Sequence, residues 1–71
     1  MIKPKGMSYA EAKSYVEKVE KEYLTAFKHV EISLGRDRVG EYVDVEGYTR
    51  RDRRLFVRMA RDTSFGPENV E

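Results

Sequence analysis

The sequence of 71 residues contains no cysteine, a single histidine and no long hydrophobic run. Without cysteine the chain can form neither a disulfide nor a zinc–thiolate site, and it is compatible with a reducing compartment. One histidine is too few for a histidine-based metal site. No segment approaches the length of a transmembrane helix, and the first residues lack the apolar region of a signal peptide. We therefore expect a soluble cytoplasmic protein with no membrane partner.

The sequence also has little that indicates catalysis. It contains no Gly-rich phosphate loop, no Ser/His/Asp or Cys/His arrangement and no metal-ligand spacing. His29 is expected at a helix–strand junction, where a half-exposed structural role is favoured over a general base. Asp44 and Glu46 share one face of an expected strand, where such a pair is more often a solvated surface than an acid/base pair. We predict a non-enzymatic protein without a cofactor, a metal or a small-molecule substrate.

The length allows one small domain with one thin hydrophobic core. A chain of this size is marginally stable unless a staple or a partner helps, and without disulfides or metals the remaining source of stability is oligomerisation. We expect one domain over residues 8–65, with a flexible lead-in at 1–7 and a short acidic tail at 66–71.

The first secondary-structure signal is an amphipathic helix that begins at Ser8. Ser8 and Glu11 have the spacing of a capping box, in which the serine side chain accepts from the glutamate amide and the glutamate carboxylate reaches back. Apolar residues then recur at spacings of three and four, which predicts a helix of about six turns. These residues are Tyr9, Ala12, Val16, Val19, Tyr23, Phe27 and Val30.

The period then changes from helical spacing to alternation. Val30, Ile32 and Leu34 alternate with polar residues, which is typical of a half-buried strand. A turn is expected at 35–38, and residues 41–46 alternate again, with Val43 and Val45 facing inward. The two strands predict a β-hairpin.

A second helix is expected from Thr49, because Thr49 and Asp52 repeat the capping pattern. At helical spacing, apolar residues share one face and five arginines share another. The apolar residues are Leu55, Phe56, Met59 and Ala60, and the arginines are Arg50, Arg51, Arg54, Arg58 and Arg61. The helix should end near Thr63, before Gly66 and Pro67. The sequence therefore predicts an α+β fold with the order helix–strand–strand–helix (αββα).

The predicted arginine face is the candidate binding surface, with Tyr42 beside it. One interpretation is a solvated face or salt bridges to Glu41, Asp44 and Glu46. The others are an acidic protein partner and nucleic acid, since guanidinium groups suit carboxylates and phosphates. A net charge of +1 disfavours nucleic acid, which usually needs a basic excess over the whole domain. Packing is the favoured role for most of the five tyrosines.

The order of elements resembles the small bacteriophage head–tail joining proteins of the lambda W type. The matching stretches are residues 10–24 as the first helix, 30–34 and 42–46 as the hairpin, and 48–55 as the start of the second helix. The resemblance implies a non-enzymatic adaptor that docks as a ring at the portal of a phage head, and hence a virion-associated location. That family often has a basic C-terminal tail, whereas this chain ends in an acidic one.

From the sequence we predict a small structural or interaction protein that acts by self-association and by docking through the arginine face. The alternative is a nucleic-acid-binding accessory or regulatory protein of a phage or mobile element.

Overall fold

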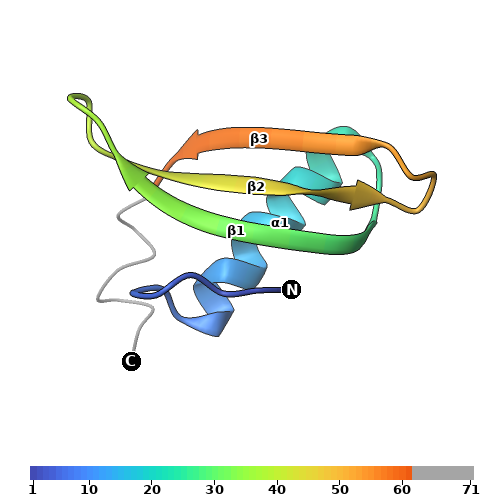
Figure 1. The fold of residues 1–71 in the computed structure, drawn as a ribbon, viewed down its shortest axis with the longest axis horizontal. Helices are drawn as coiled ribbons and strands as arrows, with labels where there is room; N and C mark the ends of the chain where they lie inside the picture. The colour runs from blue at the N-terminus through green and yellow to red at the C-terminus, as the bar shows by residue number, and fades with distance from the viewer. Residues whose placement is uncertain (62–71) are drawn as a thin grey trace.

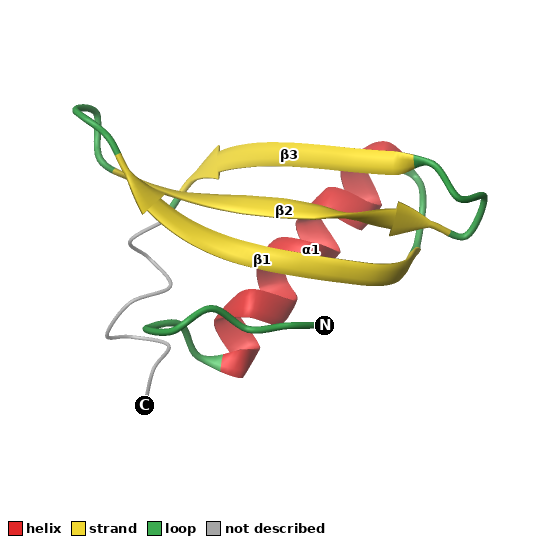
Figure 2. Ribbon diagram, in the orientation of Figure 1, coloured by secondary structure: helices red, strands yellow, loops and turns green. Residues whose placement is uncertain are grey.

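In the computed structural model, which describes residues 1–61, one helix is followed by three strands. They are α1 (Tyr9–Tyr23), β1 (Phe27–Arg36), β2 (Glu41–Thr49) and β3 (Arg54–Ala60). The strands form an antiparallel sheet in the order β1-β2-β3 (Figure 1). Helix α1 crosses one face of this sheet, and no described element covers the other, which we call the open face (Figure 2). The α+β class is confirmed.

Helix α1 begins where the sequence predicts and ends earlier. The Ser8 side chain accepts a hydrogen bond from the Glu11 amide at 3.0 Å, as one half of the capping box requires. The Glu11 carboxylate does not reach back to the Ser8 amide as the capping box predicts, because it binds Arg61 instead. The helix ends at Tyr23, and Leu24 follows in a left-handed conformation with φ of 53°. The chain beyond this point is extended, so the predicted six turns were too many.

The predicted hairpin is confirmed, with longer strands than the sequence indicated. Strands β1 and β2 pair from Arg36 and Glu41 at the turn to Phe27 and Thr49 at the far end. A bulge at Lys28 interrupts this register. Each strand alternates between the helix-covered face and the open face, because successive side chains of a strand point to opposite sides.

The predicted second helix is wrong, and within residues 1–61 the αββα order is replaced by αβββ. Residues Arg54–Ala60 form β3, which pairs with β2 along its whole length. The T-x-x-D pattern starts a turn here rather than a helix. The predicted end of that helix near Thr63, the domain boundary at 65 and the tail at 66–71 lie outside the described residues. No helix within residues 1–61 is long and apolar enough to cross a membrane.

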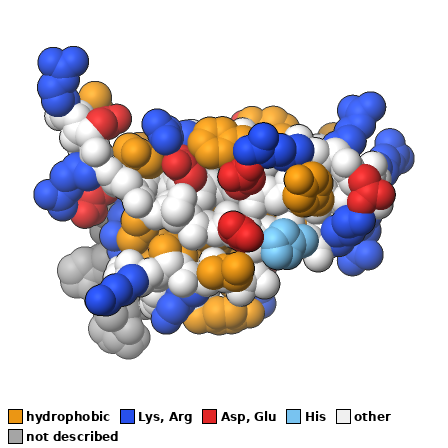
Figure 3. Space-filling view, in the orientation of Figure 1, with side chains coloured by type: hydrophobic (Ala, Val, Ile, Leu, Met, Phe, Trp, Pro, Cys, Tyr) orange, Lys and Arg blue, Asp and Glu red, His pale blue; other side chains and the backbone are white. Residues whose placement is uncertain are grey.

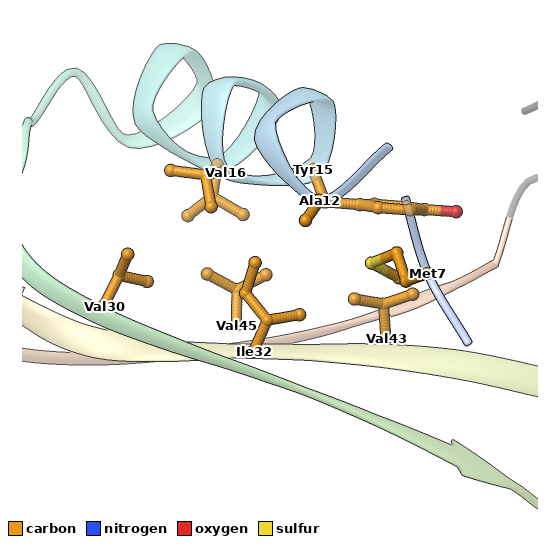
Figure 4. Packing of buried hydrophobic residues seen from close by; sticks show 9 residues of the cluster. Met7, Ala12, Tyr15, Val16, Val30, Ile32, Val43 and Val45 are labelled. Atoms are coloured by element: carbon orange, nitrogen blue, oxygen red, sulfur yellow. The ribbon is translucent and has the colours of Figure 1, made fainter. Parts of the chain in front are cut away.

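The hydrophobic core lies between one side of α1 and the covered face of the sheet (Figure 4). Its buried members are Met7, Ala12, Tyr15, Val16, Val19, Val30, Ile32, Val43 and Val45. The valines of β2 face inward as predicted. Met7, which the sequence assigns to a flexible lead-in, is buried between helix and sheet, and Ile2 forms a bridge with Glu31 at the edge of β1. The first residues therefore pack against the domain.

Candidate binding surface

The five arginines that the sequence assigned to one helical face lie in three separate places. Arg50 and Arg51 are in the turn between β2 and β3, where Arg53 joins them. Arg54 and Arg58 point from β3 onto the open face. Arg61 follows β3 and binds a carboxylate of α1. The single cationic face is thus a wrong prediction, because residues 50–53 form a turn and residues 54–60 form a strand. Only Arg54 and Arg58 share a face of that strand, and Arg61, an odd number of residues further on, is directed to the other side.

On the open face, Arg58 is held by Asp44 and Tyr42, and its guanidinium carbon also lies 6.0 Å from the centre of the Phe56 ring. Its Nε and one terminal nitrogen donate to the two carboxylate oxygens of Asp44 at 2.8 and 3.0 Å. Its guanidinium carbon lies 4.0 Å from the centre of the Tyr42 ring, a cation–π contact. The hydrogen bond to Asp44 raises the pKa of Arg58. The Tyr42 ring itself lies over Gly35, where a Cβ would meet the ring at 2.3 Å. Tyr42 and Arg58 are therefore engaged within the fold.

Arg54 is also bound to a carboxylate of β2 on the same face, that of Glu46. Its Nε donates to a Glu46 carboxylate oxygen at 2.6 Å, and a terminal nitrogen donates to the same atom. Asp44 and Glu46, the acidic pair of β2, are thus both bound to arginines of β3, and the charges of this face are largely balanced. Within residues 1–61 no group of three or more His, Asp or Glu side chains is arranged to hold a metal ion.

Arg61 links the sheet to the helix. It donates to both carboxylate oxygens of Glu11 at 2.9 and 3.1 Å, and the Glu11 side chain is only 6% exposed. This hydrogen bonding raises the pKa of Arg61. A second carboxylate, that of Glu41, lies 3.8 Å away and also binds Arg36 at 2.8 Å. The hydrogen bond from Arg36 lowers the pKa of Glu41. Arg61 is a structural cation rather than a free one.

The turn between β2 and β3 carries arginines that, unlike Arg54, Arg58 and Arg61, have no carboxylate partner within residues 1–61. Thr49 Oγ1 accepts from the amides of Arg51 and Arg53 at 3.2 and 3.3 Å, and the Thr49 carbonyl accepts from the Asp52 amide at 2.9 Å. Asp52 then adopts φ of 60°, so a tight turn and a left-handed residue join the strands, as in a three-residue hairpin loop. The amides of all four turn residues donate hydrogen bonds, while the side chains of Arg50, Arg51 and Arg53 project outward.

We call these three arginines the cationic tip. Their residues are exposed, and within the described chain none of their side chains makes an ion pair. The acid of the turn, Asp52, pairs with Lys28 of the β1 bulge. Figure 3 shows acidic side chains along the middle of the open face and Lys and Arg side chains at the end where β2 joins β3.

An apolar surface lies beside the cationic tip, at the end of α1. Leu24 is 90% exposed and Tyr23 is 46% exposed, and we call these two residues the apolar shelf. Shelf and tip line one shallow depression of about 550 Å³ between the helix end and the β2–β3 turn. The Arg50 amide donates to the Ala26 carbonyl at 3.3 Å, which fixes the two sides of the depression to each other.

The sequence analysis did not single out Arg53, Leu24 or Tyr23, which line this depression. It did name Arg54, Arg58 and Arg61, which the structure pairs with carboxylates of the same chain. The alternation of residues 54–59 could have revealed the strand, and with it the turn at 50–53. Comparison with family models, with curated proteins and with solved structures finds no match to this chain. The resemblance to phage head–tail joining proteins stays a prediction.

Proposed function

We propose that this protein is a non-enzymatic interaction module whose cationic tip and apolar shelf together bind an acidic segment of a protein partner. The observation that carries the proposal is the contrast in arginine pairing. Arg54, Arg58 and Arg61 all have carboxylate partners, whereas Arg50, Arg51 and Arg53 have none within residues 1–61. A cluster of unpaired guanidinium groups suits carboxylates or phosphates presented by another molecule.

The apolar shelf favours a protein partner over nucleic acid. Leu24 adopts a left-handed conformation that glycine normally occupies after a helix, and yet its side chain is almost fully exposed. A local feature that costs conformational energy and gains no packing is commonly found at a functional site. A leucine and a tyrosine beside three arginines match a segment that alternates acidic and apolar side chains. The phosphate backbone of DNA offers no apolar counterpart.

The test is the binding of a fluorescein-labelled peptide of alternating Glu and Leu residues, followed by anisotropy. The variant Arg50→Gln/Arg51→Gln/Arg53→Gln should bind about tenfold more weakly, because three exposed ion pairs contribute about 1–2 kcal/mol together. Lys3→Gln/Lys5→Gln/Arg38→Gln is the matched control, since it also removes three positive charges. We expect it to bind the peptide within about threefold of the wild type, a change of about 0.6 kcal/mol.

Two outcomes would contradict the proposal. Equal losses in the two variants would mean that only net charge matters. Binding of duplex DNA in place of the peptide, with an affinity that falls steeply with salt and that depends on the tip, would establish the nucleic-acid alternative.

A further inference from the structure

The two outer edges of the sheet differ in whether another segment of the described chain pairs with them. At the β1 edge, Ile2 bridges to Glu31 and its amide donates to the Val30 carbonyl at 3.4 Å, while the bulge at Lys28 breaks the regular spacing. At the β3 edge, no residue of the described chain pairs with the strand, and its register with β2 has no bulge. Strand β3 contains no proline, lysine or inward-pointing charge, three of the usual protections of a free edge, and the charges of its two arginines are paired with carboxylates of β2.

The hydrogen-bonding groups on this edge can be assigned by alternation. The Thr49 amide donates to the Arg53 carbonyl, and the Arg61 amide donates to the Glu41 carbonyl. The backbone N–H and C=O groups of the odd-numbered residues in this segment therefore point toward β2. Along an antiparallel strand, successive residues direct these backbone groups alternately toward the partner strand and away from it. The amides and carbonyls of the even-numbered residues therefore point outward, from Arg54 to Ala60. A regular row of donors and acceptors is left for another strand.

We propose that a second copy of this chain pairs with this edge, β3 against β3 in antiparallel orientation about a two-fold axis at Val57. This register is the one in which the whole strand Arg54–Ala60 is paired with itself, because Val57 is its middle residue. It brings every outward-pointing backbone group opposite a partner. Two three-stranded sheets then become one six-stranded sheet.

The side chains of β3 are complementary to themselves in this register. On the open face, Phe56 lies opposite Arg58 of the second copy. In the single chain Phe56 is 50% exposed, with its own Arg58 guanidinium 6.0 Å from the centre of its ring. An arginine over an aromatic ring is a favourable pair. No arginine of β3 lies opposite another arginine, and the charges of Arg54 and Arg58 are already balanced by carboxylates of β2.

On the covered face, the same register joins half-buried apolar residues. Val57 lies opposite Val57 of the second copy, and Leu55 lies opposite Met59. In each single chain these three residues pack only partly against the core. Pairing would extend the core across the two-fold axis, which is the added stability that so small a domain lacks. The cationic tip is not needed for this contact, so the inference stands apart from the proposed function.

The first experiment uses cysteine substitutions, since the chain has no cysteine of its own. Val57→Cys should form an intermolecular disulfide under mild oxidation. Val57 would face its copy as a non-hydrogen-bonded pair, whose Cα atoms lie about 4.5 Å apart, within the range that a disulfide needs. Leu55→Cys is the control, since it would lie four residues out of register with itself, about 13 Å away. Equal crosslinking of the two variants would overturn the proposed register.

The second experiment measures mass by light scattering over a dilution series of the full chain. The wild type should show a concentration-dependent dimer. Phe56→Lys should weaken that dimer by about tenfold or more, because lysine would oppose Arg58 at two symmetric places. Tyr48→Lys is the matched control: Tyr48 is 47% exposed on the same face but lies on the central strand. A monomer at every concentration, or equal weakening by both variants, would overturn the proposal.

Discussion

The two turns of the sheet are stabilised in the same way and yet differ in how many of their arginines are paired. Within residues 1–61, Arg38 alone lacks an ion pair at the first turn, whereas all three arginines lack one at the second. Asp37 begins the β1–β2 turn and accepts two turn amides at 2.9 and 3.1 Å. Thr49 begins the β2–β3 turn and accepts two at 3.2 and 3.3 Å. Beside the first turn, Glu41 binds both Arg36 and Arg61. At the second, the three arginines of the cationic tip have no such partners within residues 1–61.

This difference separates the charges that hold the fold from those that are available to a partner. The carboxylates at one end of the sheet are paired across strand, turn and helix, so a substitution there should cost stability. The arginines at the other end contribute little to the folded state, because only their backbone is engaged. Substitutions at the tip should therefore change binding and leave folding almost unchanged.

The largest expected effect is that of Arg61→Ala. It would leave Glu11 almost fully buried without its cation, and we expect the free energy of unfolding to fall by about 3 kcal/mol. Arg51→Ala at the tip is the matched substitution and should change it by less than about 0.5 kcal/mol. Urea unfolding followed by circular dichroism measures both. Similar losses at the two positions would break the comparison.

The next effect in size concerns the backbone of the turns. Gly40 has φ of +150° in the β1–β2 turn, with no atom within 4 Å of an added Cβ. Gly40→Ala should therefore cost about 1–2 kcal/mol from backbone strain alone. In the other turn, Asp52→Gly should change stability by less than about 0.5 kcal/mol, because relief of the left-handed conformation offsets the lost pair with Lys28. Thermal unfolding of both variants tests this prediction. A Gly40→Ala protein that unfolds at the same temperature as the wild type would contradict it.

A smaller effect of opposite sign is expected at the apolar shelf. Leu24→Gly should raise the free energy of unfolding by about 1 kcal/mol, since glycine adopts the left-handed conformation without strain. The same variant should bind the Glu–Leu peptide more weakly. Val39→Gly is a suitable control for exposure, because Val39 is 95% exposed at the opposite end. If Leu24→Gly binds the peptide as the wild type does, the shelf is not part of the site.

The smallest effect is the pH dependence that comes from Glu41. Its pKa is lowered below the ordinary value of 4.5 when the chain folds, chiefly by the hydrogen bond from Arg36. The stabilisation is therefore complete above the unfolded pKa and is lost as the pH falls through the folded one. Glu41→Gln should be less stable than the wild type at neutral pH, and the difference should shrink in acid. Urea midpoints measured from pH 7 downward show whether the two curves converge; parallel curves would contradict the assignment.

The sequence predicted those parts of the fold in which one periodicity was unambiguous. Ser8 fixed the start of α1, and the inward positions of Val43 and Val45 followed from strict alternation. The length of α1 was overestimated because Phe27 and Val30 fit a helical spacing as well as a strand. What decides between them is the pairing of β1 with β2, a tertiary interaction that no local pattern contains.

The second helix was predicted for a related reason. Leu55, Val57 and Met59 alternate as a strand requires, but the exposed Phe56 between them gave the segment an apolar face at helical spacing as well. Thr49 accepts amide hydrogen bonds in a turn as readily as at a helix start, so the capping pattern did not discriminate. The arrangement of the arginines was wrong for this reason: Arg50 and Arg51 lie in a turn, Arg54 and Arg58 lie on a strand, and the predicted binding role of these residues stays a prediction.

The close approach at Gly47 has a consequence for how this fold can change over time. A Cβ at this position would lie 2.2 Å from the His29 carbonyl oxygen, an atom of the opposing backbone that no side-chain rearrangement can move aside. Any descendant sequence that keeps this close approach of β2 to the His29 backbone is expected to keep glycine here, even where every surface arginine has been replaced. The strand pairing therefore constrains residue 47 far more tightly than the fold constrains the exposed arginines.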